Sequence, residues 1–214
     1  MAFAPDAATL LGFIAASVVL ALTPGPDMAL FLGKTLAQNR AAGLAAFSGA
    51  AAGILLHTSL AALGLSALLA ASPQAFLVLK LVGALYLLWL AWAALRHGSS
   101  LALERRAEAP QPLREVFLMG LGINLLNPKI VLFFVTFLPQ FVDPGDPHAA
   151  GKLAFLGLTF ILTAIPICVG LILAADRLAA GLRRSRRAMR VLDWLFAGLM
   201  GGFAAKLLLT RTVG

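Results

Sequence analysis

The sequence has very few of the side chains that crosslink proteins or carry out acid–base and redox chemistry. Its 214 residues include one cysteine, three histidines and nine acidic residues. A single cysteine excludes a disulfide framework or a dithiol redox pair within one chain, so we interpret Cys168, in an apolar segment, as a small buried hydrophobic residue. The phosphate-binding pattern GxxxxGK followed by Ser or Thr is also absent. ATP is therefore not expected to be the direct energy source, and no cofactor is expected.

Charged residues are scarce as well, and what replaces them is apolar. Only 12% of the residues are charged, 61% are hydrophobic, and the mean hydropathy is +0.94. A soluble domain of this length could not cover so much apolar surface, so most of its surroundings should be lipid. A spanning helix needs about 20 mainly apolar residues. The sequence predicts an all-α polytopic membrane protein whose six transmembrane helices are 7–33, 42–70, 75–95, 114–141, 152–175 and 190–209.

The net charge of +8 does not indicate nucleic-acid binding, because the basic residues gather in alternate loops. Twelve of the seventeen fall on one side of the predicted membrane: Lys34, Arg40, Arg96, Arg105, Arg106, Arg114, Arg177, Arg183, Arg184, Arg186, Arg187 and Arg190. The positive-inside rule places these loops in the cytoplasm and both termini in the periplasm. The N-terminal MAFAPDAATL has no basic n-region of a secretory signal, which agrees with an outward N-terminus. The arginine run 183–190 is expected to contact anionic membrane lipid.

The predicted helices divide into two halves. Residues 98–113 belong to the only long polar stretch, which we interpret as a cytoplasmic linker between a first three-helix repeat, 1–97, and a second, 114–214. Because three is an odd number, a repeated unit would enter the membrane in opposite orientations. Inverted three-plus-three repeats recur in transporters, where interrupted helices at matching positions indicate the binding site. GPDMALFL (25–32) and NPKIVLFF (127–134) match in this way, with Pro26 at Pro128 and Asp27 at Lys129.

Both matching segments are expected to break their helices. Proline lacks an N–H group and interrupts a helix, but it suits the first position of a new one. Asn127 is therefore predicted to cap a restarting helix, and Asp27 to lie in the first turn of another. Interrupted backbone inside a membrane is tolerated where protein buries it or where it lines a polar cavity. The first and fourth spans thus predict a polar site.

The two charged residues at these breaks have two interpretations. A charge at the centre of a spanning helix costs about 2.5–3.5 kcal/mol and needs a partner. Asp27 and Lys129 could form a structural ion pair between the halves. Alternatively, Asp27 could hold the ammonium group of an amino acid while Lys129 and the helix ends hold its carboxylate. Lys129 is predicted near the bilayer centre, and Asp27 nearer the cytoplasmic surface.

Four stretches resemble the LysE/RhtB family of amino-acid exporters: LTPGPD (22–27), NRAAGLAAFSGAAAGILLH (39–57), GALYLLWLAWAALR (83–96) and NLLNPKIVLFFVTFLPQFV (124–142). The resemblance implies six hydrophobic segments in a bacterial inner membrane. It also implies export of amino acids or close derivatives, such as homoserine, threonine or lysine, in exchange for protons or another cation. The substrate-binding positions it implies are Pro24, Gly25, Pro26, Asp27, Asn124, Asn127, Pro128, Lys129 and Gln140. A homodimer is one oligomeric state that it leaves open.

His57 lies in the middle of the second predicted span, and with Asp27 it is a candidate for proton coupling, since the ordinary pKa of histidine is near 6.5. A hydrogen-bonded packing role is the simpler interpretation. A membrane-embedded enzyme is an alternative function, but Ser48 and His57 lie on opposite faces of one helix, about 13 Å apart, and cannot form a nucleophile–base pair. Transport of a metal cation or another small solute, by a relative in the wider superfamily, is another alternative. Clustered carboxylates in the spans would support metal transport, but the spans lack them. No metal site is therefore predicted.

Overall fold

The computed structural model describes residues 5–65, 109–143 and 146–175, together with scattered residues between 78 and 96 and between 177 and 208. All regular structure in the three continuous ranges is helical, which confirms the all-α prediction. The expected spans over 75–95 and 190–209 lie outside these ranges, although the residues described within them are helical.

Two described helices are long and apolar enough to cross a membrane alone. α3 (Arg40–Leu60) begins at an Asn39 side chain that accepts a hydrogen bond from the Ala42 N–H, and it continues into the π-helical turn η1 (Ala61–Leu65). α8 (Ala149–Leu173) is the other. Each corresponds to a predicted span, the second and the fifth.

The predicted first and fourth spans are each a pair of helices bent by 51° at a short break. The first consists of α1 (Ala7–Leu22) and α2 (Pro26–Ala37). The other consists of α6 (Leu113–Leu126) and α7 (Pro128–Leu132), which continues through the π-helical η2 (Phe133–Phe137) into the 3-10 turn η3 (Leu138–Phe141). The prediction that these two spans are broken at their proline motifs is confirmed. With both bent pairs counted as spans, the described residues supply four.

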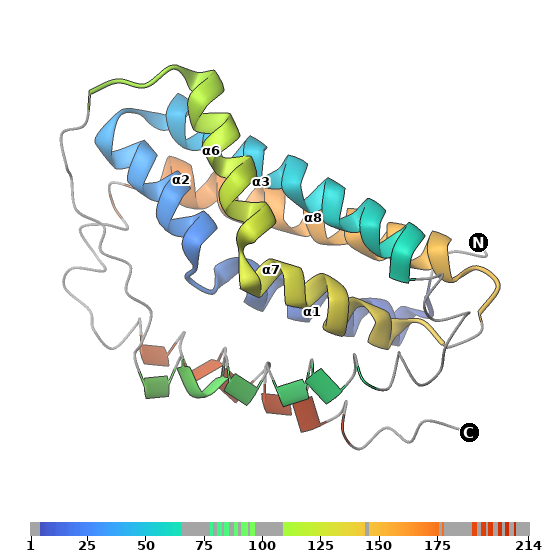
Figure 1. Ribbon diagram of the computed structural model, residues 1–214. Helices are drawn as coiled ribbons and strands as arrows, with labels where there is room; N and C mark the ends of the chain where they lie inside the picture. Colours follow the sequence, from blue (N-terminus) through green and yellow to red (C-terminus); the bar gives the residue numbers. More distant parts are fainter. Residues whose placement is uncertain are drawn as a thin grey trace.

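The bent pairs run alongside each other in opposite order (Figure 1). α1 lies with the α7–η3 segment, where the Phe13 ring is 6.1 Å from that of Phe133 and 5.2 Å from that of Phe141. α2 packs near α6. α3 and α8 each contact both bent pairs. As a result, the break in one pair lies beside the break in the other.

Two apolar clusters flank the breaks. The α1 cluster includes Phe13, Leu20, Phe133, Phe134, Phe137, Leu153, Leu156 and Phe160. The α2 cluster includes Met28, Phe31, Leu32, Phe47, Val116, Cys168 and Ile172. Each cluster contains residues from both predicted halves. The packing of these large side chains on the two sides of the breaks holds the polar breaks in place.

Glycine allows α3 and α6 to pack closely. A Cβ atom placed on Gly49 would lie 2.0 Å from the Phe117 carbonyl oxygen, and one on Gly120 would lie 2.1 Å from that of Ala46. Such distances are far inside van der Waals contact, so the two backbones touch only because these side chains are absent. The GAAAG segment 49–53 is therefore a packing surface.

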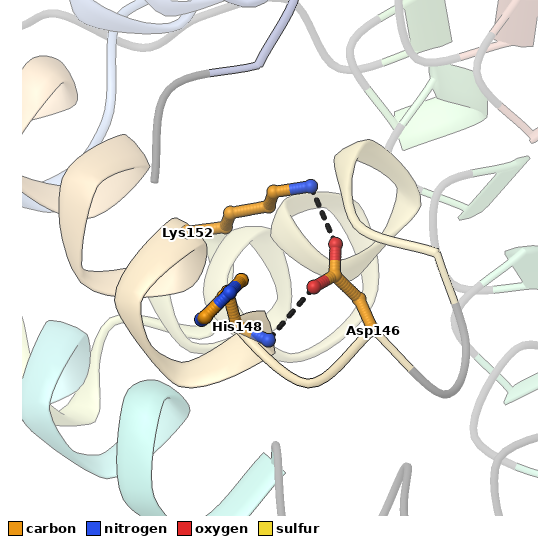
Figure 2. A network of polar contacts seen from close by, with 3 residues as sticks. All are labelled: Asp146, His148 and Lys152. Carbon is orange, nitrogen blue, oxygen red and sulfur yellow. Dashed lines mark hydrogen bonds and ion pairs between the residues drawn. The ribbon is translucent and has the colours of Figure 1, made fainter. Parts of the chain in front are cut away.

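A polar network closes the loop before α8 (Figure 2). The Asp146 carboxylate accepts hydrogen bonds from the backbone N–H of His148 and from the Lys152 ammonium group, with which it also forms an ion pair. The hydrogen bond from Lys152 is the main cause that lowers the pKa of Asp146 from its ordinary value of 3.8. The ionised carboxylate thus connects the loop to the first turn of α8.

We expect Asp146→Asn to lower the melting temperature only slightly, by about 2 °C or less, as is typical of an accessible ion pair. Because the folded-state pKa is lowered, the stabilisation is present above the ordinary value of 3.8 and is lost as the pH falls through the folded-state value. Thermal unfolding in detergent at pH 7 and pH 3 should show a larger difference from wild type at pH 7 than at pH 3. Asp143→Asn, at an exposed neighbouring carboxylate, is the control. An equal loss at both pH values would contradict the assignment.

Candidate functional site

The first break separates α1 from α2 at Thr23–Gly25. Thr23 ends α1 by donating its N–H and its hydroxyl to the Val19 carbonyl, at 3.0 and 2.7 Å. Gly25 is fully extended, with φ −171° and ψ −179°, and α2 begins at Pro26. Two prolines explain this conformation, since each lacks an N–H and disfavours helix in the residue before it. Asp27 lies in the first turn of α2, as predicted.

The second break is a single residue, Asn127, which is extended between α6 and α7. Its side-chain oxygen accepts a hydrogen bond from the Lys129 N–H at 3.1 Å, and its carbonyl accepts from Ile130 and Val131. Pro128 occupies the first helical position, where no N–H is needed. The prediction that Asn127 caps a restarting helix is confirmed.

Asp27 is held by the other broken span. Its Oδ2 atom accepts hydrogen bonds from the side-chain amides of Asn124, at 2.8 Å, and Asn127, at 3.0 Å. Hydrogen bonds to an ionised group are about twice as strong as those between neutral groups. Asp27 Oδ1 is buried and has no hydrogen-bond partner among the described residues. The carboxylate is therefore fixed in orientation with one acceptor oxygen unused.

Lys129 makes the reciprocal contact. Its ammonium group donates to two backbone carbonyls at the end of α1, those of Leu20 at 3.0 Å and Thr23 at 2.7 Å. The last carbonyls of a helix lack intrahelical partners and carry partial negative charge, so a cation is favourable there. Each break thus sends one charged side chain to the opposite span.

A small cavity of about 50 Å³ lies at the crossing. Its polar lining comes from Thr23, Gly25, Asp27, Asn127 and Lys129. The rest of the lining is mainly apolar and comes from Leu20, Ala21, Met28, Phe31, Phe47, Ala50, Ile54, Ile130, Phe160, Ala164 and Cys168. Since a water molecule needs about 10–15 Å³ of such volume, the cavity has room for a few waters. The site therefore combines two opposite charges with apolar walls.

Comparison with known proteins identifies the family. A family model described as LysE type translocator matches residues 18–211, which include both breaks and the whole cavity lining. The chain belongs to the LysE type translocator family. It is therefore a membrane transporter and not an enzyme, and the resemblance seen in the motifs is confirmed.

The translocator is 35% identical over 205 residues to an uncharacterised membrane protein of Pseudomonas aeruginosa, and the match covers 91% of this chain and 92% of that protein. It is 29% identical over 187 residues to the homoserine/homoserine lactone efflux proteins of Salmonella typhimurium and Salmonella typhi, covering 87% of this chain and 89% of each relative. No solved structure matches the chain.

The translocator brings most of the predicted site residues together. Gly25, Asp27, Asn127 and Lys129 line the cavity, and Asn124 is fully buried beside it. Pro24, Pro26 and Pro128 shape the breaks. Gln140 lies elsewhere, in η3, where its side-chain amide donates to the Thr136 carbonyl at 2.9 Å.

His57 of the translocator is outside the cavity lining. Its ring stacks on Phe134, with centroids 5.7 Å apart, and its Nε2 atom is buried without a hydrogen-bond partner among the described residues. It is one helical turn beyond Gly53, which packs on the Asn124 side chain. A packing role and a proton-coupling role both remain compatible with this position.

Sequence reasoning missed the α3 wall of Phe47, Ala50 and Ile54 and two further parts of the site. One is the pair of carbonyls that bind Lys129, which no side-chain pattern could indicate. The other is the α8 wall formed by Phe160, Ala164 and Cys168. These three recur every fourth residue, and with Leu153 and Leu156 they form one buried helix face. That spacing is a usable signal for burial but not for lining a cavity.

Proposed function

We propose that this translocator exports a small amino-acid-like solute, of the homoserine type, from the cytoplasm by antiport with a proton or another cation. The observation that carries the proposal is the crossed arrangement of charges, in which Asp27 and Lys129 each bind the opposite broken span. Substrate binds at this crossing, in a bacterial inner membrane, with both termini in the periplasm. Two relatives are homoserine/homoserine lactone efflux proteins, which supports the class of cargo.

The proposal includes two inverted repeats, 1–97 and 114–214, joined by the linker 98–113. Both broken spans bend by the same 51°, and both restart with proline at the first position and a charged residue next. They also lie alongside each other in opposite order. These three features are what an inverted duplication would produce.

Asp27 supplies the recognition of the cargo. Its Oδ1 atom is the unused acceptor at a cavity that otherwise has mainly apolar walls. An ammonium group that donates to this oxygen would satisfy a buried polar atom, which is otherwise costly. Asn124 and Asn127 hold the carboxylate in place for this contact.

Alternating access follows from the two apolar clusters. They lie on either side of the cavity, and the cavity is too small for an amino acid in this structure. Opening the α2 cluster would admit cargo from the cytoplasm, and opening the α1 cluster would release it outside. Packed interfaces of this kind favour two discrete arrangements over continuous deformation.

Transport into inside-out vesicles tests the proposed function. With an acidic lumen, the wild type should accumulate labelled homoserine several-fold above equilibrium, because outward proton flow drives the cargo in. A protonophore should abolish the accumulation, and vesicles without the protein are the control. If homoserine, threonine and lysine all fail to accumulate under any imposed ion gradient, the proposal is wrong.

A further inference from the structure

We propose that the carbonyl groups at the end of α1 form a site for one monovalent cation, that Lys129 fills this site with its own ammonium group, and that the proton on this ammonium is the coupling ion. The inference rests on the transport function proposed above, and it assigns the coupling step to one side chain. Asp27 then binds the ammonium group of the cargo, and coupling requires no free metal ion.

The first support is the geometry of the carbonyls. The oxygens of Leu20 and Thr23 converge on one ammonium group at 3.0 and 2.7 Å. Carbonyls at the end of a discontinuous transmembrane helix are the groups that transporters use to coordinate a coupling ion. In this chain the positive charge at that position is covalently attached to the opposite broken span.

The second support is the space beside the site. A Cβ atom on Gly25 would lie 3.5 Å from both Cδ and Nζ of Lys129, in ordinary van der Waals contact. Gly25 and Lys129 both line the cavity. The ammonium group is thus next to the space that cargo would enter, and removal of the lysine side chain would leave room for a small free cation.

The ionisable groups that face Lys129 explain how cargo and proton would exchange. Asp27 of α2 and Cys168 of α8 line the same cavity, and His57 of α3 lies beyond Asn124. When a cargo ammonium binds Asp27, it places a second positive charge beside Lys129 and disfavours the protonated form. The Nζ–H bond then breaks, the proton passes to water and the electron pair stays on nitrogen.

Loss of this proton would also loosen the crossing. The two hydrogen bonds to Leu20 and Thr23 join α7 to α1, and they lose their charge assistance when Lys129 is neutral. Cargo binding would therefore release both the proton and a contact between the two broken spans. This links ion exchange to the motion of the halves.

Counterflow of labelled homoserine in proteoliposomes, without any ion gradient, tests the cation site. The wild-type rate should not change when sodium and potassium are replaced by N-methylglucamine. Because a neutral residue 129 corresponds to the cargo-bound form, Lys129→Ala should retain counterflow in N-methylglucamine within about three-fold of wild type. Added ammonium or methylammonium should slow this variant several-fold, because the cation occupies the emptied carbonyl site in competition with cargo. Lys152→Ala, at a lysine in the loop before α8, is the matched control and should behave as wild type.

Two outcomes would overturn the cation site: wild-type counterflow that requires sodium or potassium, or a Lys129→Ala rate that no small cation changes. If Lys129→Ala does not fold, Lys129→Met keeps the length of the side chain without the charge; it should retain counterflow that no small cation changes, because methionine fills the space, and loss of its counterflow would contradict the proposal. A wild type that moves no cargo would instead contradict the proposed function.

Lys129→Arg tests the coupling proton separately. Arginine keeps its positive charge at all accessible pH values, so it can occupy the carbonyl site but cannot release a proton. This variant should lose both counterflow and accumulation driven by a proton gradient, because its permanent charge opposes a cargo ammonium on Asp27. Accumulation at the wild-type level would show that the coupling proton is carried elsewhere, with Asp27 and His57 as the other candidates.

Discussion

Asp27→Asn should reduce homoserine transport by about ten- to a hundred-fold while the protein still inserts and folds. The amide keeps the shape of the side chain and can still accept a hydrogen bond from Asn124 or Asn127. It removes the negative charge that would bind the cargo ammonium, and charged partners of this kind contribute about 1.5–3 kcal/mol each. The loss should appear both in accumulation and in counterflow, since binding precedes both.

The control for this variant is Gln140→Ala. Gln140 was predicted as a site residue, but its amide contacts only a carbonyl of its own turn among the described residues, so transport should be nearly unchanged. Size-exclusion chromatography and thermal unfolding of both variants in detergent establish folding. Normal transport by Asp27→Asn would remove Asp27 from the binding site.

The structural interpretation of the two charges has its own test. If Asp27 and Lys129 act only as a lock between the halves, Asp27→Lys combined with Lys129→Asp should restore folding and transport that each single reversal loses. The contacts argue for a different result. Asp27 binds amide donors and Lys129 binds carbonyl acceptors, so the exchanged side chains would each meet groups of the wrong polarity. The double reversal is therefore expected to remain inactive.

Gly120→Ala should be one of the most destabilising small substitutions in the described helices. The new Cβ atom would lie 2.1 Å from the Ala46 carbonyl oxygen and 2.9 Å from its carbon, so α3 and α6 would have to separate. Overpacking of this kind costs about 1–3 kcal/mol, and the rigid backbone on the other side favours the upper end of that range. For a chain of this length the melting temperature should fall by about 2–4 °C for each kcal/mol.

Gly122→Ala on the same helix is the matched control. A Cβ atom there meets nothing within 4 Å, and alanine is about 1 kcal/mol better than glycine inside a helix. We therefore expect no loss of stability, or a small gain. Thermal unfolding of the two purified variants in the same detergent compares them directly, and equal melting temperatures would show that the α3–α6 contact is looser than the structure indicates.

Much of the site could be predicted because proline acts locally. Pro24, Pro26 and Pro128 each constrain their own backbone and that of the preceding residue, so the sequence alone located both breaks. The capping role of Asn127 followed from the same local rules. The apolar spans could also be predicted from the sequence, because a helix that crosses lipid needs an apolar composition that helices of soluble proteins do not have.

What the breaks contact could not be predicted in the same way. By counting residues, Asp27 was placed nearer the cytoplasmic surface than Lys129. The structure brings both charges to the same crossing, because α1 runs beside α7 and α2 beside α6. Counting residues along one span does not show how far the neighbouring span is displaced along the same axis.

The sequence by itself determined three features: the chain spans a membrane, its helices break at the proline motifs, and the two breaks carry Asp27 and Lys129. Only the tertiary structure decided that Asp27 binds two amides and that Lys129 binds the carbonyls of Leu20 and Thr23. The physical reason is that every residue has a carbonyl. The position of a carbonyl group in space depends on how the helices pack. The side-chain type of the residue that carries it does not indicate that position.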